Sequence, residues 1–533
     1  MICFENARIF TGNGESANCM VICDGRFEFV GHVSEAHNRY PHAKRVDLGG
    51  SFVCPGFNDS HMHLLSLGNS LAQAQLAGHT DSLSGMLEAV RRFADDHKDR
   101  DWILGRGWNQ DYFTDIVRFP DRYDLDRICP DKPCMITRAC GHIAIANTSA
   151  LALAGISTHA PDVSGGKVYT NPQGVPTGVL AENAISLVSS LIPKPTRAEI
   201  KHRLMLAMAH ANSFGITSVH SDDFSSADVP FEEILAAYTE LKAEGKMTVR
   251  VNEQCLLSGM TELERFLSGG YQTGWGDEWL RIGPLKLLTD GSLGARTAYL
   301  NAPYSDAPDT RGIAIYTQEE LDELIIKAHC SGMQIAAHAI GDAAADMVLC
   351  AVEKAQAVCP RHDVRHGIVH AQVFTPEQVV RMKSLGMHAY IQPIFLDYDT
   401  QIVFDRLGER ALKAYPSASL HKNGVTFSAG SNCPVEPPDV FEGLQCAVTR
   451  KPVTREAEYA YLPHEALPLD LALQSFSAFG AYASFEENTK GRIQAGFLAD
   501  FTVLDQNPFE IEADKIHLIR PTAVYVQGKN ILL

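Results

Sequence analysis

The stretch VCPGFNDSHMHL, residues 53–64, decides both the fold and the chemistry expected of this chain. An apolar strand candidate, residues 52–59, is followed at once by His61 and His63. Residues two apart on a strand point to the same face, so both imidazoles should project in one direction. Taken alone, this His-x-His pair is as consistent with polar residues in a turn as with a metal site.

Seven further apolar segments of strand length follow, and most of them precede an amphipathic segment with helical spacing. Alternating strands and helices predict an α/β fold, and eight such units predict a distorted (β/α)8 TIM barrel. The active site of such a barrel lies at the carboxyl ends of its strands. The further strand candidates are residues 216–220, 248–255, 282–290, 333–338, 367–370, 387–393 and 425–431.

The two ends of the chain have a different pattern from its interior. Residues 1–57 alternate apolar and polar side chains around Asn-Gly, Asp-Gly and Gly-Gly turns, and residues 485–533 have the same character. We therefore predict a small β-sandwich domain built from both ends and a barrel over residues 58–484. Residues from about 66 to about 195 exceed an ordinary loop, and we expect them to form an insertion of helices and loops beside the barrel mouth.

Three later residues occupy positions comparable to that of the His-x-His pair. His338 and His370 each end an apolar strand candidate, and Lys286 lies between leucines inside another. A single strand-end histidine is more often structural, whereas a lysine in a buried strand is costly unless it has a function. Four histidines and a lysine on one rim predict a site for one or two divalent metal ions. Zinc is the first choice, and manganese, iron or cobalt are the alternatives.

Characteristic sequence blocks extend over nearly the whole chain. In these blocks the chain resembles the amidohydrolase superfamily, and within it the amidohydrolase-3 branch that contains N-substituted formamide deformylase. The blocks are VCPGFNDSHMHL, RGWNQDYF, RACGHIAIANTSALALAGI, GVPTGVLAENA, GITSVH, KLLTDGSLGARTA, AAHAIGDAA, IVHAQ, GSNCPVEP and KGRIQAGFLADFTVLD.

The resemblance implies a role for each strand-end residue. His61 and His63 would bind the more buried metal, and His338 and His370 would bind the second one. Lys286 matches a lysine that is carbamylated in binuclear members and bridges the two metals. Two cations lower the pKa of a bridging water and polarise the carbonyl group that is cleaved.

The eighth strand departs from the family pattern. The family has Gly-Ser-Asp there, whereas this chain reads Ser431-Asn432-Cys433, with Asn432 at the position of the aspartate. In the family, that aspartate binds a metal and moves a proton from the water to the leaving amine. An amide coordinates weakly and cannot act as a general base. The chain therefore uses another base such as Asp290 or Glu436, or has reduced activity, or carries a substitution engineered to trap a ligand.

Two further residues are candidates for contact with a substrate. His142 lies in the insertion, within one of the blocks named above, and Asp290 follows Lys286 in Asp-Gly-Ser. Asp290 is equally consistent with a turn-forming residue, because an aspartate side chain can bond to the backbone two residues further on.

Composition and charge exclude several classes of function. The net charge of −18 repels nucleic acids and anionic membranes, and no apolar run reaches the roughly 18 residues of a membrane span. The first residues lack the basic segment of a signal peptide, and the 13 cysteines contain no CxxC pair, so we expect reduced thiols. A cytoplasmic enzyme with a small-molecule amide substrate is expected, with a homodimer as one option for its assembly.

The leading hypothesis is a metal-dependent hydrolase of a non-peptide C–N bond in an amide, an N-acyl or N-formyl amine, or a cyclic amide. An amidohydrolase-type deaminase is the first alternative. Adenosine-deaminase-like members have a glutamate three residues after the fifth-strand histidine, where this chain has Gly341, and this disfavours purine-type deamination. The second alternative is a catalytically impaired metal-binding barrel with a regulatory or binding role, because of Asn432.

Overall fold

The structure, a computed structural model, describes residues 1–156, 158–257 and 259–532. The chain divides into two compact units, and each is described separately. The first unit comprises Met1–Leu65, Ala207–Ser226 and Pro230–Leu533, and the second comprises Ser66–Leu206 and Ala227–Val229.

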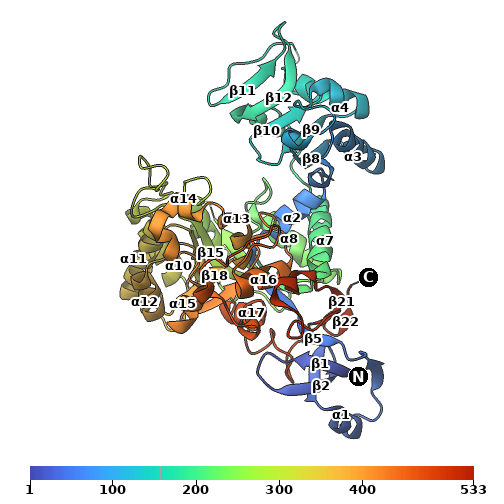
Figure 1. Cartoon of the computed structure of the whole chain (residues 1–533), viewed down its shortest axis with the longest axis vertical. Coiled ribbons are helices and arrows are strands. Elements are labelled where there is room, and N and C mark those ends of the chain that lie inside the picture. The colour runs from blue at the N-terminus through green and yellow to red at the C-terminus, as the bar shows by residue number, and fades with distance from the viewer. Residues whose placement is uncertain (157, 258, 533) are drawn as a thin grey trace. The chain divides into compact units, whose positions relative to one another are not determined.

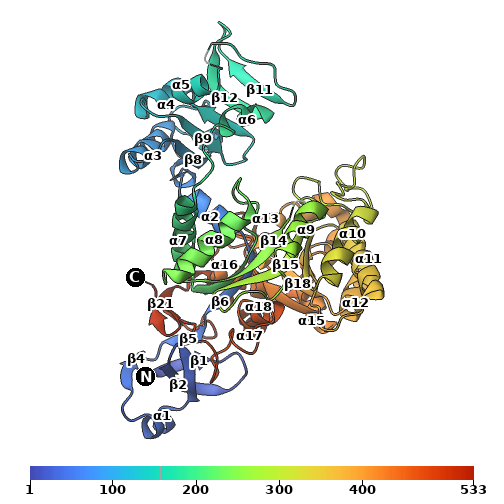
Figure 2. The same ribbon diagram turned by 180° about the vertical axis from the view of Figure 1, so that it is seen from behind.

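Eight parallel strands of the first unit form the predicted barrel (Figure 2). The hydrogen-bonded order is β19-β18-β17-β16-β15-β14-β13-β6, so each barrel strand lies beside the next one along the chain. All eight strand candidates are confirmed as strands, with ends that differ by a few residues. The barrel strands are β6 (Phe57–Met62), β13 (Ile216–Ser221), β14 (Arg250–Leu256), β15 (Leu280–Leu288), β16 (Ile335–Ala339), β17 (Gly367–His370), β18 (His388–Ile391) and β19 (Thr426–Ala429).

The first strand candidate, residues 52–59, is divided between two sheets. Its first part, β5 (Phe52–Pro55), pairs with β20 (Phe501–Leu504) near the C-terminus, whereas β6 pairs with β13 in the barrel. The chain passes between the sheets at Gly56, where a Cβ atom would lie 2.2 Å from Oγ1 of Thr217. Only glycine permits this close approach, so the barrel strand begins one residue later and contains the first histidine.

Helices cover the outside of the barrel (Figure 2). Three of the amphipathic segments expected after the strand candidates form α10 (Gln318–Cys330), α11 (Asp342–Val358) and α12 (Pro376–Ser384). Capping boxes at Thr317 and Thr375 begin α10 and α12, which satisfies backbone N–H groups that have no partner inside the helix. The other helices are α8 (Phe231–Ala243), α9 (Met260–Ser268), α13 (Leu396–Asp399), α14 (Val403–Leu407), α15 (Ser417–Lys422), α16 (Val440–Thr449), α17 (Leu469–Ser475) and α18 (Ala478–Ala483).

Strands from both ends of the chain form another sheet in the first unit (Figure 1). Its path is β22-β21-β20-β5-β1-β2-β3, and β4 pairs with β1. The rings of Phe4 and Phe27 pack against Phe501, with centroids 5.3 and 6.1 Å apart, so residues from both ends share one core. The remaining elements are β1 (Ile2–Phe10), β2 (Ser16–Cys23), β3 (Arg26–Gly31), α1 (Val33–Arg39), β4 (Lys44–Asp47), β21 (Pro521–Val526) and β22 (Lys529–Asn530).

The second unit has a sheet of its own, with six strands in the order β11-β12-β10-β9-β8-β7. The prediction of helices and loops was wrong here, because the strands are short and β8 contains two glycines and an arginine that break the alternating pattern. The elements are β7 (Ala74–Gln75), α3 (Leu83–Asp96), β8 (Ile103–Trp108), α4 (Arg122–Ile128), β9 (Cys134–Arg138), β10 (Ile143–Ala146), α5 (Thr148–Leu153), β11 (Gly166–Thr170), β12 (Pro176–Glu182) and α6 (Ser186–Ser189). The chain passes between the units within α2 (Leu64–Leu71) and α7 (Arg197–Ser213), and again on either side of Ala227–Val229.

Two further expectations concern membranes and cysteines. Among the helices of the described residues, none combines the length and the apolar character needed to cross a membrane. All 13 cysteines are free thiols, and most are buried, which agrees with their reading as small apolar core residues.

Candidate metal centre

The predicted histidines gather at the carboxyl ends of the barrel strands. The ring centroid of His61 lies 5.2 Å from that of His63 and 5.5 Å from that of His370. The centroids of His338 and His370 lie 4.5 Å apart. The structure therefore brings together all four imidazoles, which come from β6, β16, β17 and the residue directly after β6.

Lys286 of β15 is buried beside these histidines, and 1% of its side chain is exposed. Its Nζ lies 3.4 Å from Nε2 of His61 and donates a 3.4 Å hydrogen bond to Oδ2 of Asp222. Burial lowers the pKa of Lys286, and the carboxylate of Asp222 opposes this lowering. A lowered pKa increases the fraction of neutral amine, which is the form that can become a carbamate.

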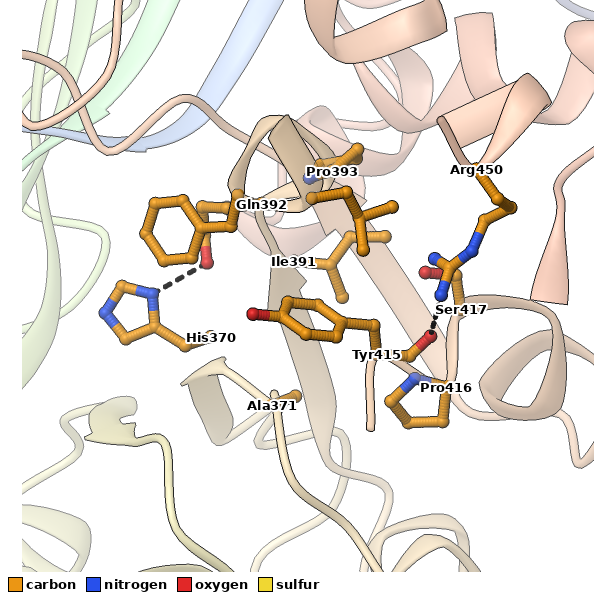
Figure 3. Close-up of a pocket in the computed structure, with 11 residues that line it drawn as sticks. His370, Ala371, Ile391, Gln392, Pro393, Tyr415, Pro416, Ser417 and Arg450 are labelled. Carbon is orange, nitrogen blue, oxygen red and sulfur yellow. Dashed lines mark hydrogen bonds between the residues drawn. The ribbon is translucent and has the colours of Figure 1, made fainter. Parts of the chain in front are cut away.

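Hydrogen bonds to side-chain amides determine which nitrogen carries the proton in two of the rings. Nδ1 of His61 donates to Oε1 of Gln254 at 2.7 Å, and Nε2 of Gln254 donates to the carbonyl of Ser60 at 3.3 Å. Nδ1 of His370 donates to Oε1 of Gln392 at 2.7 Å (Figure 3). In both rings Nε2 keeps its lone pair, as a metal ligand requires.

His338 is held through its other nitrogen. Its Nε2 lies 3.1 Å from the carbonyl oxygen of Gly291 and 3.2 Å from Oδ1 of Asp290, so Nε2 carries the proton and Nδ1 is free. Oδ2 of Asp290 accepts the backbone N–H groups of Tyr299 at 2.9 Å and Gly341 at 2.8 Å. Asp290 is thus fixed by the backbone and orients His338, whereas its contact with a substrate stays a prediction.

His63 lies between two oxygen atoms. Its Nδ1 is 3.1 Å from the backbone carbonyl oxygen of Asp222, and its Nε2 is 3.2 Å from Oδ1 of Asn432. A neutral imidazole carries one proton and can donate to only one of these two acceptors. The lone pair of its other nitrogen therefore faces an oxygen atom, and a cation bound by both that nitrogen and that oxygen would satisfy the arrangement. Asn432 has a φ of 61°, in the left-handed region that asparagine tolerates.

Burial keeps the inner imidazoles uncharged. Loss of hydration holds the pKa of His61 well below its usual range, and the positive charge of Lys286 adds to this effect. Burial does the same to the pKa of His370, with further contributions from His338 and Lys286. The neutral imidazole is the form that binds a metal, so the environment of both rings favours a ligand role.

The donor set fits a divalent metal by its chemistry. It offers neutral imidazole nitrogens, the amide oxygen of Asn432 and a buried oxygen of Asp222, Oδ1, that has no hydrogen-bond partner. Among the described residues, however, no group of three or more His, Cys, Asp or Glu side chains is placed so that it could hold a metal ion. The amino group of Lys286 lies against His61 instead, so metal binding would require this lysine to move or to be modified.

A cavity of about 310 Å³ lies beside the cluster, a volume that suits a small molecule. Burial raises the pKa of Glu436 in its wall to about 7, and the negative charges of Asp397 and Asp399 contribute. Glu436 can therefore hold or release a proton near neutral pH. The lining residues are Ser292, Leu293, Gly294, His338, Ile340, His370, Gln372, Phe395, Tyr398, Asp399, Asn432, Val435 and Glu436.

A much smaller pocket, of about 10 Å³, adjoins His370 (Figure 3). Arg450, at 1% exposure, lines it and donates to the backbone carbonyls of Tyr461 at 3.1 Å and Tyr415 at 3.2 Å. Burial lowers the pKa of Arg450 to about 10. The pocket has room for about one water molecule, so it supports the wall behind His370 and does not admit a substrate.

His142 belongs to the second unit, where 68% of its side chain is exposed. Its Nδ1 lies 2.9 Å from Oε2 of Glu182, and this carboxylate raises the pKa of His142. A part for His142 in substrate binding stays a prediction.

Sequence reasoning missed three residues of the cluster. Asp222 directly follows β13, so the strand-end position that identified the histidines could also have identified this carboxylate. Gln254 and Gln392 are buried amides, and their importance depends on side-chain orientation, for which the sequence holds no signal.

Comparison with known proteins assigns the chain to a family. The chain matches the model of the amidohydrolase family over residues 44–531. It is 33% identical over 525 residues to YtcJ of Bacillus subtilis (strain 168), covering 97% of this chain and 96% of that protein. N-substituted formamide deformylase of Arthrobacter pascens is 26% identical over 540 residues, covering 99% of this chain and 97% of the relative.

A solved structure agrees with the match. An uncharacterized metal-dependent hydrolase from Pyrococcus furiosus superposes with a TM-score of 0.79 at 29% identity, covering 95% of this chain and 99% of that chain. The resemblance read from the sequence blocks is confirmed, as is the barrel fold. The chain belongs to the amidohydrolase family.

Proposed function

We propose that this protein is a metal-dependent hydrolase of a non-peptide C–N bond, in an N-formyl or N-acyl amine or a cyclic amide. The observation that carries the proposal is the cluster of four imidazoles, each held by a hydrogen bond through one of its nitrogens. Family membership supports a hydrolase. The bond type is supported by the deformylase among the relatives, whose name describes cleavage of an N-substituted formamide.

The residues that would hold the metal are His61, His63, His338 and His370, with a carbamylated Lys286 as the candidate bridge. One or two divalent ions, zinc as the first choice, would supply a water of lowered pKa and polarise the carbonyl of the substrate.

The other residues of the site position these groups and carry protons. Gln254, Gln392 and Asp290 fix the tautomers and the ring orientations, and such outer contacts commonly contribute about 10- to 100-fold to metal affinity or activity. Glu436 lines the same cavity as Asn432, and its carboxyl can accept a proton and return it to the leaving amine.

One alternative is disfavoured by the backbone around the fifth strand. A Cβ atom at Gly341 would lie 2.0 Å from the carbonyl oxygen of Tyr299, so no side chain fits at the position of the deaminase glutamate. The alternative of a metal-binding barrel without catalysis is favoured by one observation, the neutral amide of Asn432 beside His63.

The test is metal analysis combined with turnover. The chain is purified without chelator, its metal content is measured by mass spectrometry, and hydrolysis of N-formyl amines, N-acyl amines and cyclic amides is assayed. Turnover that disappears on chelation and returns with zinc supports the proposal. Metal without turnover, even after Asn432→Asp, favours the binding barrel. Absence of metal contradicts both.

A further inference from the structure

Asp222 is a buried carboxylate tied to the segment that carries the His-x-His pair. It directly follows β13, and 1% of its side chain is exposed. Its backbone N–H donates to the carbonyl of Met62 at 3.0 Å, and its own carbonyl accepts from Nδ1 of His63 at 3.1 Å. These two bonds on either side fix its backbone relative to the candidate ligands.

The carboxylate of Asp222 is only partly satisfied. Oδ2 lies 3.4 Å from Nζ of Lys286 and 3.9 Å from Nδ1 of His63. Oδ1 is buried and has no hydrogen-bond partner. A buried carboxylate oxygen that has lost its water without gaining a partner is costly, so its presence indicates a cation or other partner that the protein atoms do not supply.

The next residue gives a contrast. Asp223 is equally buried, but its Oδ1 accepts the backbone N–H of Leu65 at 2.7 Å and its Oδ2 accepts the hydroxyl of Tyr238. Both of its oxygens are therefore used within the protein. Of these two neighbouring carboxylates, it is Asp222, beside Lys286, that keeps an oxygen without a hydrogen-bond partner.

The charge of the site gives an independent reason for a carboxylate at this position. Asn432, where the family has its aspartate, is neutral and contacts Nε2 of His63. The carboxylate of Asp222 lies 3.4 Å from Nζ of Lys286, the same atom that lies 3.4 Å from Nε2 of His61. A divalent ion among neutral imidazoles is commonly bound with an anionic ligand as well, and the carboxylate is a standard zinc ligand. The second strand therefore carries the negative charge that the eighth strand lacks.

We propose that Asp222 is the metal-ligating carboxylate of this centre, in place of the family's aspartate at position 432. The assignment rests on the proposed function. In the family, one aspartate both binds a metal and moves the proton. In this chain the metal-binding role would belong to Asp222, and Asn432 would not move the proton.

The test compares three variants with the unsubstituted protein: Asp222→Asn, the matched control Asp223→Asn, and the double variant Asp222→Asn with Asn432→Asp. Metal content is measured after purification without chelator, and zinc affinity is measured by competition with a chromogenic chelator. We expect Asp222→Asn to lose at least about 10-fold in zinc affinity and the double variant to regain it. Asp223→Asn should bind zinc as the unsubstituted protein does.

Unchanged zinc affinity in Asp222→Asn overturns the assignment. So does a loss that the double variant fails to restore, since Asp222 would then act only by holding Lys286 or the fold. If Asp222→Asn does not fold, a crystal structure of the zinc-loaded unsubstituted protein decides. An Asp222 oxygen about 2.0–2.2 Å from zinc supports the assignment, and an intervening water overturns it. Absence of metal from the unsubstituted protein overturns the proposed function itself.

Discussion

Among the described residues, two lysines are buried, Lys490 and Lys286, and they differ in how closely they are paired. Lys490 is 4% exposed, lies 2.7 Å from Oε2 of Glu486 and donates to Oγ of Ser218 at 2.7 Å. Lys286 is just as buried, but its carboxylate partner Asp222 lies 3.4 Å away. Burial of a lysine is therefore not what marks the functional site. The candidate site is distinguished by a buried lysine, Lys286, whose charge is paired less closely by the surrounding protein.

A histidine at the amino end of the barrel strands and a histidine of the candidate metal centre differ in the same way. His388 begins β18, and both of its nitrogens face hydroxyl groups, Thr426 at 3.0 Å and Ser428 at 2.8 Å. His61 has one nitrogen bonded to Gln254, and its other nitrogen faces Lys286. We call Lys490, Glu486, Ser218 and His388 the amino-end cluster. The polar contacts that these side chains make are 2.7–3.0 Å long, whereas those of Lys286 in the candidate metal centre are 3.4 Å long.

The largest expected effect separates these two groups of histidines. His61→Asn should abolish metal retention and lower amide turnover by at least about 10³-fold, because enzymes commonly accelerate reactions by about 10⁶-fold or more and the metal is the source of that acceleration. His388→Asn should keep the metal and lose stability. Metal analysis, turnover and thermal unfolding of both variants are the measurements. Retention of metal by His61→Asn would contradict the distinction.

Barrel topology is the reason why the sequence could predict that these histidines gather. Parallel strands carry their carboxyl ends to one rim, so His338 and His370 become neighbours although 32 positions separate them. No such rule exists for Gln254 or Gln392, whose contribution depends on which amide atom faces a ring. The sheet of the second unit was missed because its strands are short, and the crossing at Gly56 depends on contact with a distant threonine.

The second prediction concerns Asn432→Asp. The substitution restores a proton acceptor beside His63, so amide turnover should rise by about 10²–10⁴-fold, the usual contribution of a general base, with metal content unchanged. Steady-state kinetics on the amide panel and metal analysis test this. Equal or lower turnover from an already active parent would mean that the proton moves by another route, and loss of activity in Glu436→Gln would then identify it.

The third prediction compares the two lysines directly. Lys490→Met leaves Glu486 buried without its cation and should lower the free energy of unfolding by about 3–5 kcal/mol. Lys286→Met should reduce metal content, with a smaller loss of stability in the zinc-loaded protein because the metal compensates Asp222. Urea unfolding and metal analysis measure both. An equal loss of stability in the two variants would show that Lys286 is also a structural residue.

The smallest effect is a dependence of stability on pH that arises in the amino-end cluster. Burial lowers the pKa of His388 to about 3, and the positive charges of His220 and Arg365 contribute. The unfolded chain titrates near 6.5 at this residue, so between these two values it binds a proton that the folded chain does not. The stability contributed by neutral His388 is therefore fully present above about pH 6.5 and is lost as the pH falls toward 3.

The slope from His388 is at most about 1.4 kcal/mol per pH unit. Urea unfolding of the metal-free protein at about pH 7 and about pH 5 measures it, since removing the metal first separates this effect from acid release of zinc. His388→Gln can still bond to Ser428 but does not titrate, so its stability should depend less on pH. A slope as steep as that of the parent would show that His388 becomes protonated within the folded chain, and the amino-end cluster would then be less tightly closed than its hydrogen bonds indicate.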